Sequence, residues 1–343
     1  MLSMNDRFAS TLRTTQELLQ QWGVVVAFVV LFGISTWNQG FDFLNAENFR
    51  ALLNSHAPVG ILAIGMTLVI ICGGIDLSVG SIVVLAAAIG VTTMNALIER
   101  STSESNAVLV GAIVTLLCGV AAGSLNGVLV VFGRIAPFIA TLGGLAAFRS
   151  MSLAVADAGE IRSQSATLFG SLGRGGIPLP FLENAVGRQL TLSNSTVIFF
   201  SLAAIAQWML SRARFGRHII AVGANETAAR YAGLPIAWIR FRVYALMGLF
   251  AGIAALIQSS RMNSVSTAQL GLGNELDAIA AVVIGGTSLR GGFGRVWGTV
   301  VGVLILGMIT NILTISGVSP YWQGAVKGGV IVLAVLVQRG SRG

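Results

Sequence analysis

Long apolar segments separated by short polar stretches dominate the chain. Ten of them can be recognised, at roughly 20–37, 51–72, 79–98, 107–132, 137–157, 194–211, 243–261, 276–289, 296–316 and 323–338. Most approach the length of about 20 residues that an α-helix needs to cross the hydrocarbon core of a bilayer. The pattern predicts an all-α, polytopic membrane protein with about ten transmembrane helices. The eighth segment is short for a full span, so we expect it to be broken or re-entrant, which lipid tolerates only where protein or a watery cavity covers the backbone.

The polar stretches predict a simple layout. Residues 1–19 form an amino-terminal segment, residues 20–338 a single membrane domain, and residues 339–343 a short tail. Two connections are long. Residues 158–193 are glycine-rich with few charges and are predicted to be an external loop, whereas residues 212–242 are strongly basic and are predicted to be cytoplasmic.

The positions of the basic residues predict the orientation. If the amino terminus is inside and the segments alternate, 13 basic residues fall on the cytoplasmic side and 6 outside. Cytoplasmic loops of membrane proteins carry the excess of arginine and lysine. We therefore expect both termini in the cytoplasm.

Composition excludes several other classes of function. The chain is 55% hydrophobic and only 10% charged, so most of its surface cannot face water. Its net charge of +8 does not indicate nucleic-acid binding, because the charge lies between apolar blocks instead of clustering on a soluble face. Cys72 and Cys118 lack metal-ligand spacing. We expect no metal site, no catalytic residues and no nucleic-acid partner.

Glycines recur at helical spacing within the predicted spans. Gly119, Gly123 and Gly127 share one face of the fourth segment, and Gly248 and Gly252 share one face of the seventh. Small residues at this spacing let helices approach closely in lipid. These faces predict helix packing in preference to substrate contact.

The second and third segments are joined by Gly73-Gly74-Ile75-Asp76-Leu77-Ser78-Val79-Gly80-Ser81. Two glycines can end a helix, and Asp76 or Ser78 can cap the next one by accepting hydrogen bonds from its free amides. A tight turn with an N-cap is the simpler interpretation, and a turn that contacts a cytoplasmic partner is the alternative. A related pattern at Gly285–Gly292 suggests an internal repeat of the kind found in transporters.

The basic loop contains the pattern of a short capped helix. Asn225 is a good N-cap, Glu226 suits a first turn, and Gly233 ends the helix after about two turns. Ala228, Ala229 and Ala232, with their small side chains, would offer a smooth contact face. The residues alone leave two interpretations equally open: a contact with a partner protein, or a helix lying on lipid headgroups.

Taken together, these stretches resemble the permease subunits of ribose-type ABC sugar importers. Four ordered blocks within residues 20–338 carry the resemblance: Ile64–Ser81, Asn126–Gly127 with Pro137–Gly143, Phe215–Gly233, and Glu275–Gly286. The resemblance implies an ATP-driven importer in the bacterial inner (plasma) membrane that works by alternating access. It also implies three partners: an ABC ATPase subunit that binds ATP and Mg²⁺, a periplasmic sugar-binding protein, and a second permease subunit that is a copy or a paralogue. The chain itself would bind no cofactor and would not be an enzyme.

The resemblance assigns a role to the capped helix, which would be the coupling helix seated in a groove of the ATPase. The residues matched to this role are Arg217, Gly223, Asn225, Glu226, Ala228, Ala229 and Gly233. The signature turn is matched at Gly73, Gly74, Asp76, Ser78 and Gly80. Glu275 and Asp277 also match, without a defined role, and could cap the eighth segment.

A sugar path needs hydroxyl-binding groups and aromatic faces. By chemistry and approximate depth the candidates are Asn126, Phe138, Thr141 and Asn311. The alternative for the amides is that they cross-link helices within the bundle.

Two other functions are weighed against the sugar importer. One is an ABC permease for branched-chain amino acids or nucleosides. The other is an ion-coupled secondary carrier, which would need a carboxylate or histidine near the membrane midplane to hold the coupling ion. The predicted spans hold no such residue in a convincing central position.

Overall fold

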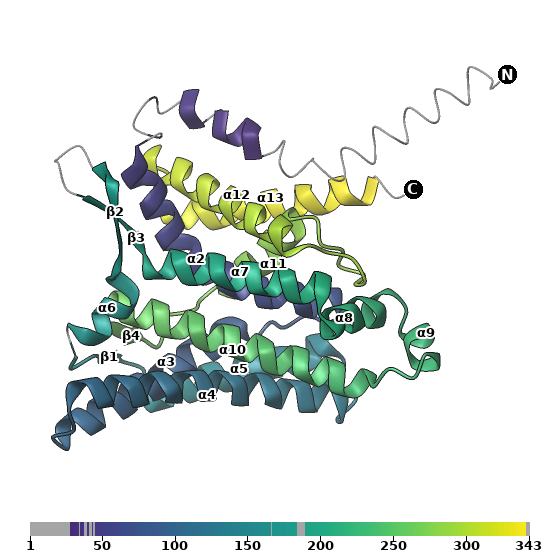
Figure 1. Cartoon of the computed structure of the whole chain (residues 1–343), viewed down its shortest axis with the longest axis horizontal. Coiled ribbons are helices and arrows are strands. Elements are labelled where there is room, and N and C mark those ends of the chain that lie inside the picture. The colour runs from purple at the N-terminus through teal and green to yellow at the C-terminus, as the bar shows by residue number, and fades with distance from the viewer. Residues whose placement is uncertain are drawn as a thin grey trace.

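The long apolar runs fold as helices that lie side by side in a bundle (Figure 1). The computed structural model describes residues 28–33, 35–37, 40, 43, 45–165, 167–183 and 189–340. The predictions for residues 1–19 and for the end of the tail, residues 341–343, lie outside the described residues, as does half of the first apolar segment.

The helices labelled in Figure 1 have the following bounds: α2 Ala46–Ile71, α3 Val79–Glu99, α4 Glu104–Val131, α5 Pro137–Val155, α6 Leu168–Arg174, α7 Asn194–Arg212, α8 Arg214–Ala224, α9 Glu226–Tyr231, α10 Ile236–Met262, α11 Asn274–Ile284, α12 Val296–Ile315 and α13 Pro320–Gly340. The strands are β1 Glu160–Arg162, β2 Gly176–Glu183, β3 Gln189–Ser193 and β4 Ser264–Ser266.

Seven helices of the described chain are long and apolar enough to cross a membrane: α2, α3, α4, α5, α7, α10 and α12. This number establishes a polytopic membrane protein, and the count of about ten spans stays a prediction. The eighth apolar segment folds as α11, which has 11 residues and is therefore only about 16 Å long at 1.5 Å per residue.

The predicted external loop, residues 158–193, contains three of the four strands, which an all-α prediction omits. β2 and β3 form an antiparallel hairpin, and β1 pairs antiparallel with β4, placing Ile161 opposite Val265. These strands are short, and hydrophobic segments of membrane-spanning length give no signal for them. β4 follows α10 directly, so its pairing with β1 fixes the end of α10 to the segment that follows α5.

Glycine faces bring the two longest central helices together, as the spacing predicted. A Cβ atom on Gly123 would lie 2.7 Å from the Cα atom of Gly248, and one on Gly119 would lie 2.9 Å from the Cα atom of Gly252. α4 and α10 are therefore in backbone contact. Beside them, α2 is the most enclosed of the seven long helices, with 78% of its apolar window buried.

The elements define two ends of the bundle. The four strands and α6 lie at one end, and α8 and α9 lie at the other (Figure 1). Residues 264–292 run between these ends, because β4 pairs with β1 while Gly292 lies against Ala224 at the end of α8. Within this stretch, an irregular segment, residues 267–273, is followed by α11 and then by the glycine-rich turn of residues 285–292.

Candidate functional site

The signature turn ends α2 as predicted. Gly73 adopts a left-handed φ of 86°, and the amides of Gly73 and Gly74 donate to the carbonyls of Ile70 and Val69 at 2.9 Å. Gly74 has no room for a side chain, because a Cβ atom there would lie 2.6 Å from the hydroxyl oxygen of Tyr244 on α10.

Asp76 lies at the centre of a buried polar cluster. Its Oδ1 accepts hydrogen bonds from the backbone N (2.9 Å) and Oγ (2.6 Å) of Ser78. Asn126 of α4 donates from Nδ2 to the Ser78 Oγ at 2.7 Å, and to both Asp76 oxygens at 3.5 Å. All three residues are fully buried. The cluster fixes the turn between α2 and α3 to α4.

The predicted capping of α3 is wrong in detail. Ser78 occupies the N-cap position, but its ψ of −4° is helical and its side chain makes no capping bond. The hydroxyl group bonds to Asp76 and Asn126 instead, and Asp76 stabilises the turn before the helix. Asp76 and Ser78 are buried, but Gly73 is exposed, so the alternative in which the turn contacts a cytoplasmic partner stays a prediction.

Burial and hydrogen bonds have opposite effects on the pKa of the Asp76 carboxyl group. Burial raises the pKa of Asp76 above its usual value, because loss of water disfavours the charged form, while the hydrogen bonds from Ser78 and Asn126 oppose that shift. The Oδ1 atom of Asn126 has no partner among the described residues and faces Gly144 of α5, where a Cβ atom would approach it to 2.7 Å.

The four predicted path residues do not form one site. Thr141 on α5 is fully buried and donates from Oγ1 to the carbonyls of Pro137 (2.8 Å) and Ile75 (3.5 Å), so it belongs with the Asp76 cluster. Phe138 is 55% exposed on the same helix. Asn311 lies far away on α12, where its Nδ2 donates to Asn48 Oδ1 at 2.8 Å, which ties α12 to α2. For Asn126 and Asn311 the structure shows the cross-linking geometry of the alternative interpretation.

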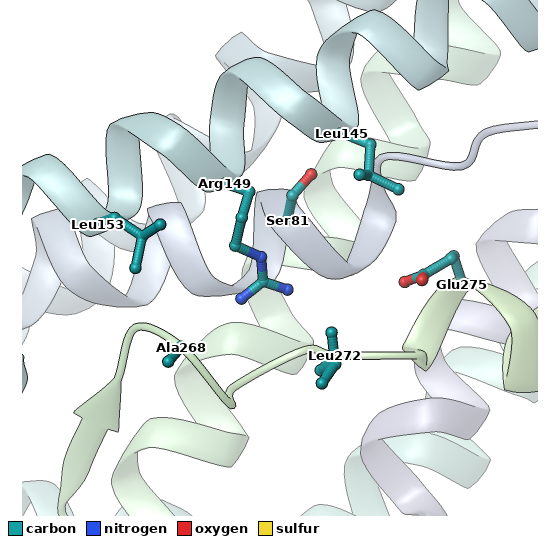
Figure 2. A pocket seen from close by; sticks show the side chains of 7 residues that line it. All are labelled: Ser81, Leu145, Arg149, Leu153, Ala268, Leu272 and Glu275. Carbon is teal, nitrogen blue, oxygen red and sulfur yellow. The ribbon is translucent and has the colours of Figure 1, made fainter. Parts of the chain in front are cut away.

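Glu275 and Asp277 lie in the first turn of α11, after the left-handed N-cap Gly273 (φ 75°). Asp277 forms an ion pair with Lys327 of α13, with Nζ and Oδ2 3.0 Å apart. Glu275 instead lines a cavity of about 360 Å³. Figure 2 shows it there opposite Arg149 of α5, with Ser81 of α3 behind them.

Gly80 of the signature turn lets α3 approach this region. A Cβ atom on Gly80 would overlap the carbonyl oxygen of Gly271 and lie 2.5 Å from a carboxylate oxygen of Glu275. The start of α3 is thereby in backbone contact with the irregular segment before α11. The sequence pattern did not predict this contact, because it joins positions far apart in the chain.

The capped helix of the basic loop has the predicted ends. The Asn225 Oδ1 accepts from the backbone N of Ala228 at 2.9 Å, and Gly233 follows α9 with a φ of 76°. The loop is more structured than predicted, since α8 precedes α9 and α10 already begins at Ile236.

Charged contacts fix α9 to α10. The carboxylate of Glu226 accepts from Arg240 Nη2 at 2.7 Å and from Arg230 Nη2 at 2.9 Å. Partial burial raises the pKa of Glu226, but the hydrogen bonds and charges of Arg240 and Arg230 outweigh this effect and bring the pKa below its usual value. Arg240 was not singled out from the sequence, because no local pattern links it to Glu226.

The predicted alanine contact face is wrong at one position. Ala228 is exposed, but Ala229 is only 4% exposed and points into the protein. The exposed aromatic side chain on this helix is Tyr231, at 89%. Arg217 is on the outer surface of α8 and donates from Nη1 to the carbonyl of Arg212 at 2.9 Å.

Gly223 connects α8 to two other elements. A Cβ atom on Gly223 would overlap the carbonyl oxygen of Ile71 at the end of α2 and lie 2.7 Å from the backbone N of Gly292. That same nitrogen donates to the Ile71 carbonyl at 2.9 Å. The two glycine-rich turns noticed in the sequence therefore meet at the base of the basic loop.

These features define the class of protein: a polytopic helical membrane protein with a structured loop at one end of its bundle. A family model described as "Branched-chain amino acid transport system / permease component" matches residues 48–335.

Relatives match along nearly the whole chain. The ribose import permease proteins of Escherichia coli and Bacillus subtilis are both 38% identical to it, covering 94% and 91% of this chain and 95% and 90% of their own lengths. The L-arabinose ABC transporter permease protein of Azospirillum brasilense is 33% identical, over 95% of this chain and 89% of its own. No solved structure matches.

The chain belongs to this family of importer permeases, whose members here include ribose-type ABC permeases. The resemblance seen in the sequence is thus confirmed, and so is the expectation of a transport subunit in place of an enzyme. The comparisons do not test the individual site residues, and their roles stay predictions.

Proposed function

We propose that the chain is the membrane-spanning permease subunit of an ATP-driven importer for a monosaccharide. The observation that carries the proposal is the identity of 38% with ribose import permeases across more than nine-tenths of the chain. A galactose/methyl galactoside import permease of Haemophilus influenzae, 33% identical over 94% of both chains, extends the range of sugars. The monosaccharide class is therefore favoured over amino acids and nucleosides.

The partners follow from the importer class. The energy for transport comes from a separate ABC ATPase subunit that binds ATP and Mg²⁺, since this chain has no phosphate-binding loop sequence. α9 is the coupling helix, and its exposed Tyr231 and Ala228 face that ATPase. A periplasmic binding protein delivers the sugar at the opposite end, and a second permease subunit, a copy or a paralogue, completes the path.

Charge supports an orientation in the bacterial inner membrane. Arg134 lies between α4 and α5, Arg212 and Arg214 lie where α7 meets α8, and Arg290 and Arg295 lie between α11 and α12, all at the α8–α9 end. Basic loops remain in the cytoplasm, so this end and both termini are cytoplasmic and the stranded end faces the periplasm. The bundle has about ten membrane-crossing segments, and the 267–273 segment together with α11 forms one of them.

The mechanism is alternating access. ATP binding closes the ATPase dimer, the coupling helices move with it, and the packed helices rock as rigid bodies about a central cavity. The buried Asp76 cluster and the α4–α10 glycine contact would keep the neighbouring helices together during that movement.

The test is uptake of labelled D-ribose, L-arabinose and D-galactose into membrane vesicles that contain the chain with its cognate ATPase and binding protein. Uptake of at least one sugar should require ATP inside the vesicles and should survive collapse of the proton gradient. Uptake that stops with the gradient yet continues without ATP would establish a secondary carrier. Uptake of labelled leucine and of no sugar would establish the amino-acid alternative.

A further inference from the structure

A cavity separates α3, α5 and the irregular segment before α11. Its volume is about 360 Å³, within the range of about 300–1,000 Å³ that small-molecule sites occupy. Its walls combine apolar and polar side chains: Leu145, Leu153, Leu272, Ala268, Ser81, Arg149 and Glu275. Figure 2 shows the guanidinium group of Arg149 and the carboxylate of Glu275 directed toward the same space from opposite sides.

The cavity lies along the middle part of α5, away from both ends of that helix. Arg149 is about 18 Å along α5 from Pro137 and about 9 Å from Val155 at 1.5 Å per residue. Ionisable side chains at such depth face protein or a water-filled cavity, because their transfer into hydrocarbon is costly. The opening beside Leu272, which is 65% exposed, therefore faces water or a partner protein and not lipid.

The irregular backbone supports the same conclusion. Residues 267–273 leave their carbonyls outside any helix, a condition that membranes tolerate where the backbone is buried in protein or lines a cavity. Arg149 Nη1 donates to the carbonyls of Thr267 (3.1 Å) and Leu270 (2.9 Å). Arg149 thus positions the segment with one nitrogen, and its Nε and Nη2 atoms make no hydrogen bond to the described residues.

Glu275 makes no ion pair with a side chain of the described residues, although the backbone amides of Gly273 and Glu275 and the charge of Arg149 stabilise its ionised form. The ion pairs of the described chain involve Glu160, Glu226 and Asp277, and none joins Glu275 to Arg149. Asp277, two residues further along α11, is neutralised by Lys327. An ionised carboxylate offers only acceptor sites and a guanidinium only donors, so this cavity presents both to one small ligand.

The geometry points to a hydroxyl-binding station of the translocation path, in which Glu275 accepts hydrogen bonds from neighbouring hydroxyl groups of the sugar. This inference rests on the proposed function and identifies residues that sequence analysis left without a role. Arg149 donates to hydroxyl oxygens through its free nitrogens, and Leu145 and Leu272 pack against the C–H face of the ring. The cavity is open on one side, so the sugar is held weakly and passes on.

The first experiment compares Glu275→Gln with wild type in the vesicles described above, using the monosaccharide that wild type takes up fastest. Losing charge-assisted hydrogen bonds should lower the maximal uptake rate about tenfold, while ATP hydrolysis stimulated by the loaded binding protein persists. Glu99→Gln, at the exposed end of α3, is the matched control and should transport normally.

Deoxy analogues separate contact with the sugar from a structural role. For the analogue that lacks a hydroxyl group bonded by Glu275, wild type and Glu275→Gln should transport at nearly equal rates. If Glu275→Gln lowers the uptake rate by the same factor for the parent sugar and for every analogue, Glu275 has a structural role and the inference is overturned. So would unchanged uptake of the parent sugar by Glu275→Gln. If wild type takes up no monosaccharide at all, the proposed function itself has failed.

A second measurement needs no change at Glu275. In a background with Cys118→Ala, Leu272→Cys should react rapidly with a membrane-impermeant charged thiol reagent, and transported sugar should slow the reaction. Leu117→Cys on the apolar face of α4 has a similar exposure in the isolated chain, 62%, and should react slowly because it faces lipid or a partner helix. Equal slow labelling of both positions would show that the cavity is not open to water.

Discussion

Gly223→Ala is the substitution for which the structure predicts the sharpest effect. The added methyl group would overlap the carbonyl oxygen of Ile71, lie 2.8 Å from the Ile71 carbonyl carbon and 2.7 Å from the Gly292 nitrogen. These three atoms belong to the backbone, and the Gly292–Ile71 hydrogen bond holds them together. The clash therefore cannot be relieved by rotating a side chain. α8 must therefore move off the end of α2.

The size of the effect follows from overpacking, which costs about 1–3 kcal/mol when a methyl group is forced into close-packed structure. α9 begins only two residues after Ala224, so it would move with α8. Uptake should fall about tenfold or more while ATP hydrolysis continues, and the melting temperature should drop by a few degrees. Gly328→Ala is the matched control, because its added Cβ would meet nothing within 4 Å on α13.

The assay measures sugar uptake and ATP hydrolysis in the same reconstituted vesicles, so that their ratio reports coupling. If Gly223→Ala shows wild-type uptake and a wild-type ratio of uptake to ATP hydrolysis, this backbone contact does not position the basic loop, and the reasoning is refuted. A loss of uptake that Gly328→Ala shares would attribute the effect to glycine replacement in general.

Three further predictions concern the basic loop and the signature turn. Tyr231→Ala should weaken binding of the ATPase subunit to the permease by about thirtyfold, since aromatic side chains that anchor interfaces contribute about 2 kcal/mol; Ala232→Gly on the same surface should not. Asp76→Ala leaves Ser78 and Asn126 without their acceptor and should lower the melting temperature and uptake more than Asp76→Asn; equal stability of both would leave the cluster dispensable. Because the pKa of Glu226 is lowered in the folded protein, its ion pairs stabilise α9 at any pH above the ordinary glutamate pKa of about 4.3. This stabilisation is lost as the pH falls through the lower pKa of the folded protein. Amide exchange in α9 should therefore accelerate at that pH in wild type but not in Glu226→Gln.

Sequence analysis predicted the elements whose signals are local. Membrane-spanning length, glycine spacing and capping residues lie within one segment, so the long helices, the packing role of the glycine faces and the ends of α9 were predicted correctly, although the pairing of α4 with α10 was not. The inward orientation of Ala229 was not, because a helix of six residues shows no clear period. The strands of residues 158–193 were missed for the same kind of reason: they have few residues and their partners are distant.

The site was harder to predict than the fold. Asn126 and Asp76 were both singled out, yet their bond joins positions 50 residues apart and changes the interpretation of each. Arg149 lies within a predicted span, and only its bonds to the carbonyls of Thr267 and Leu270 show that it supports irregular backbone. Such roles depend on tertiary contacts that a single sequence does not contain.

The basic loop contacts the bundle at two places, so a movement of this loop acts on two helices. Gly223 contacts the end of α2, and Glu226 bonds to Arg240 near the start of α10. Both helices meet again at the signature turn, where Tyr244 of α10 donates from its hydroxyl group to the carbonyl of Ile75 at 3.4 Å. A shift of α9 that moved only one of these helices would strain that turn, so we expect α2 and α10 to move together. A double-mutant cycle between Gly223→Ala and Glu226→Gln tests this, because a joint movement requires their effects on uptake to be non-additive.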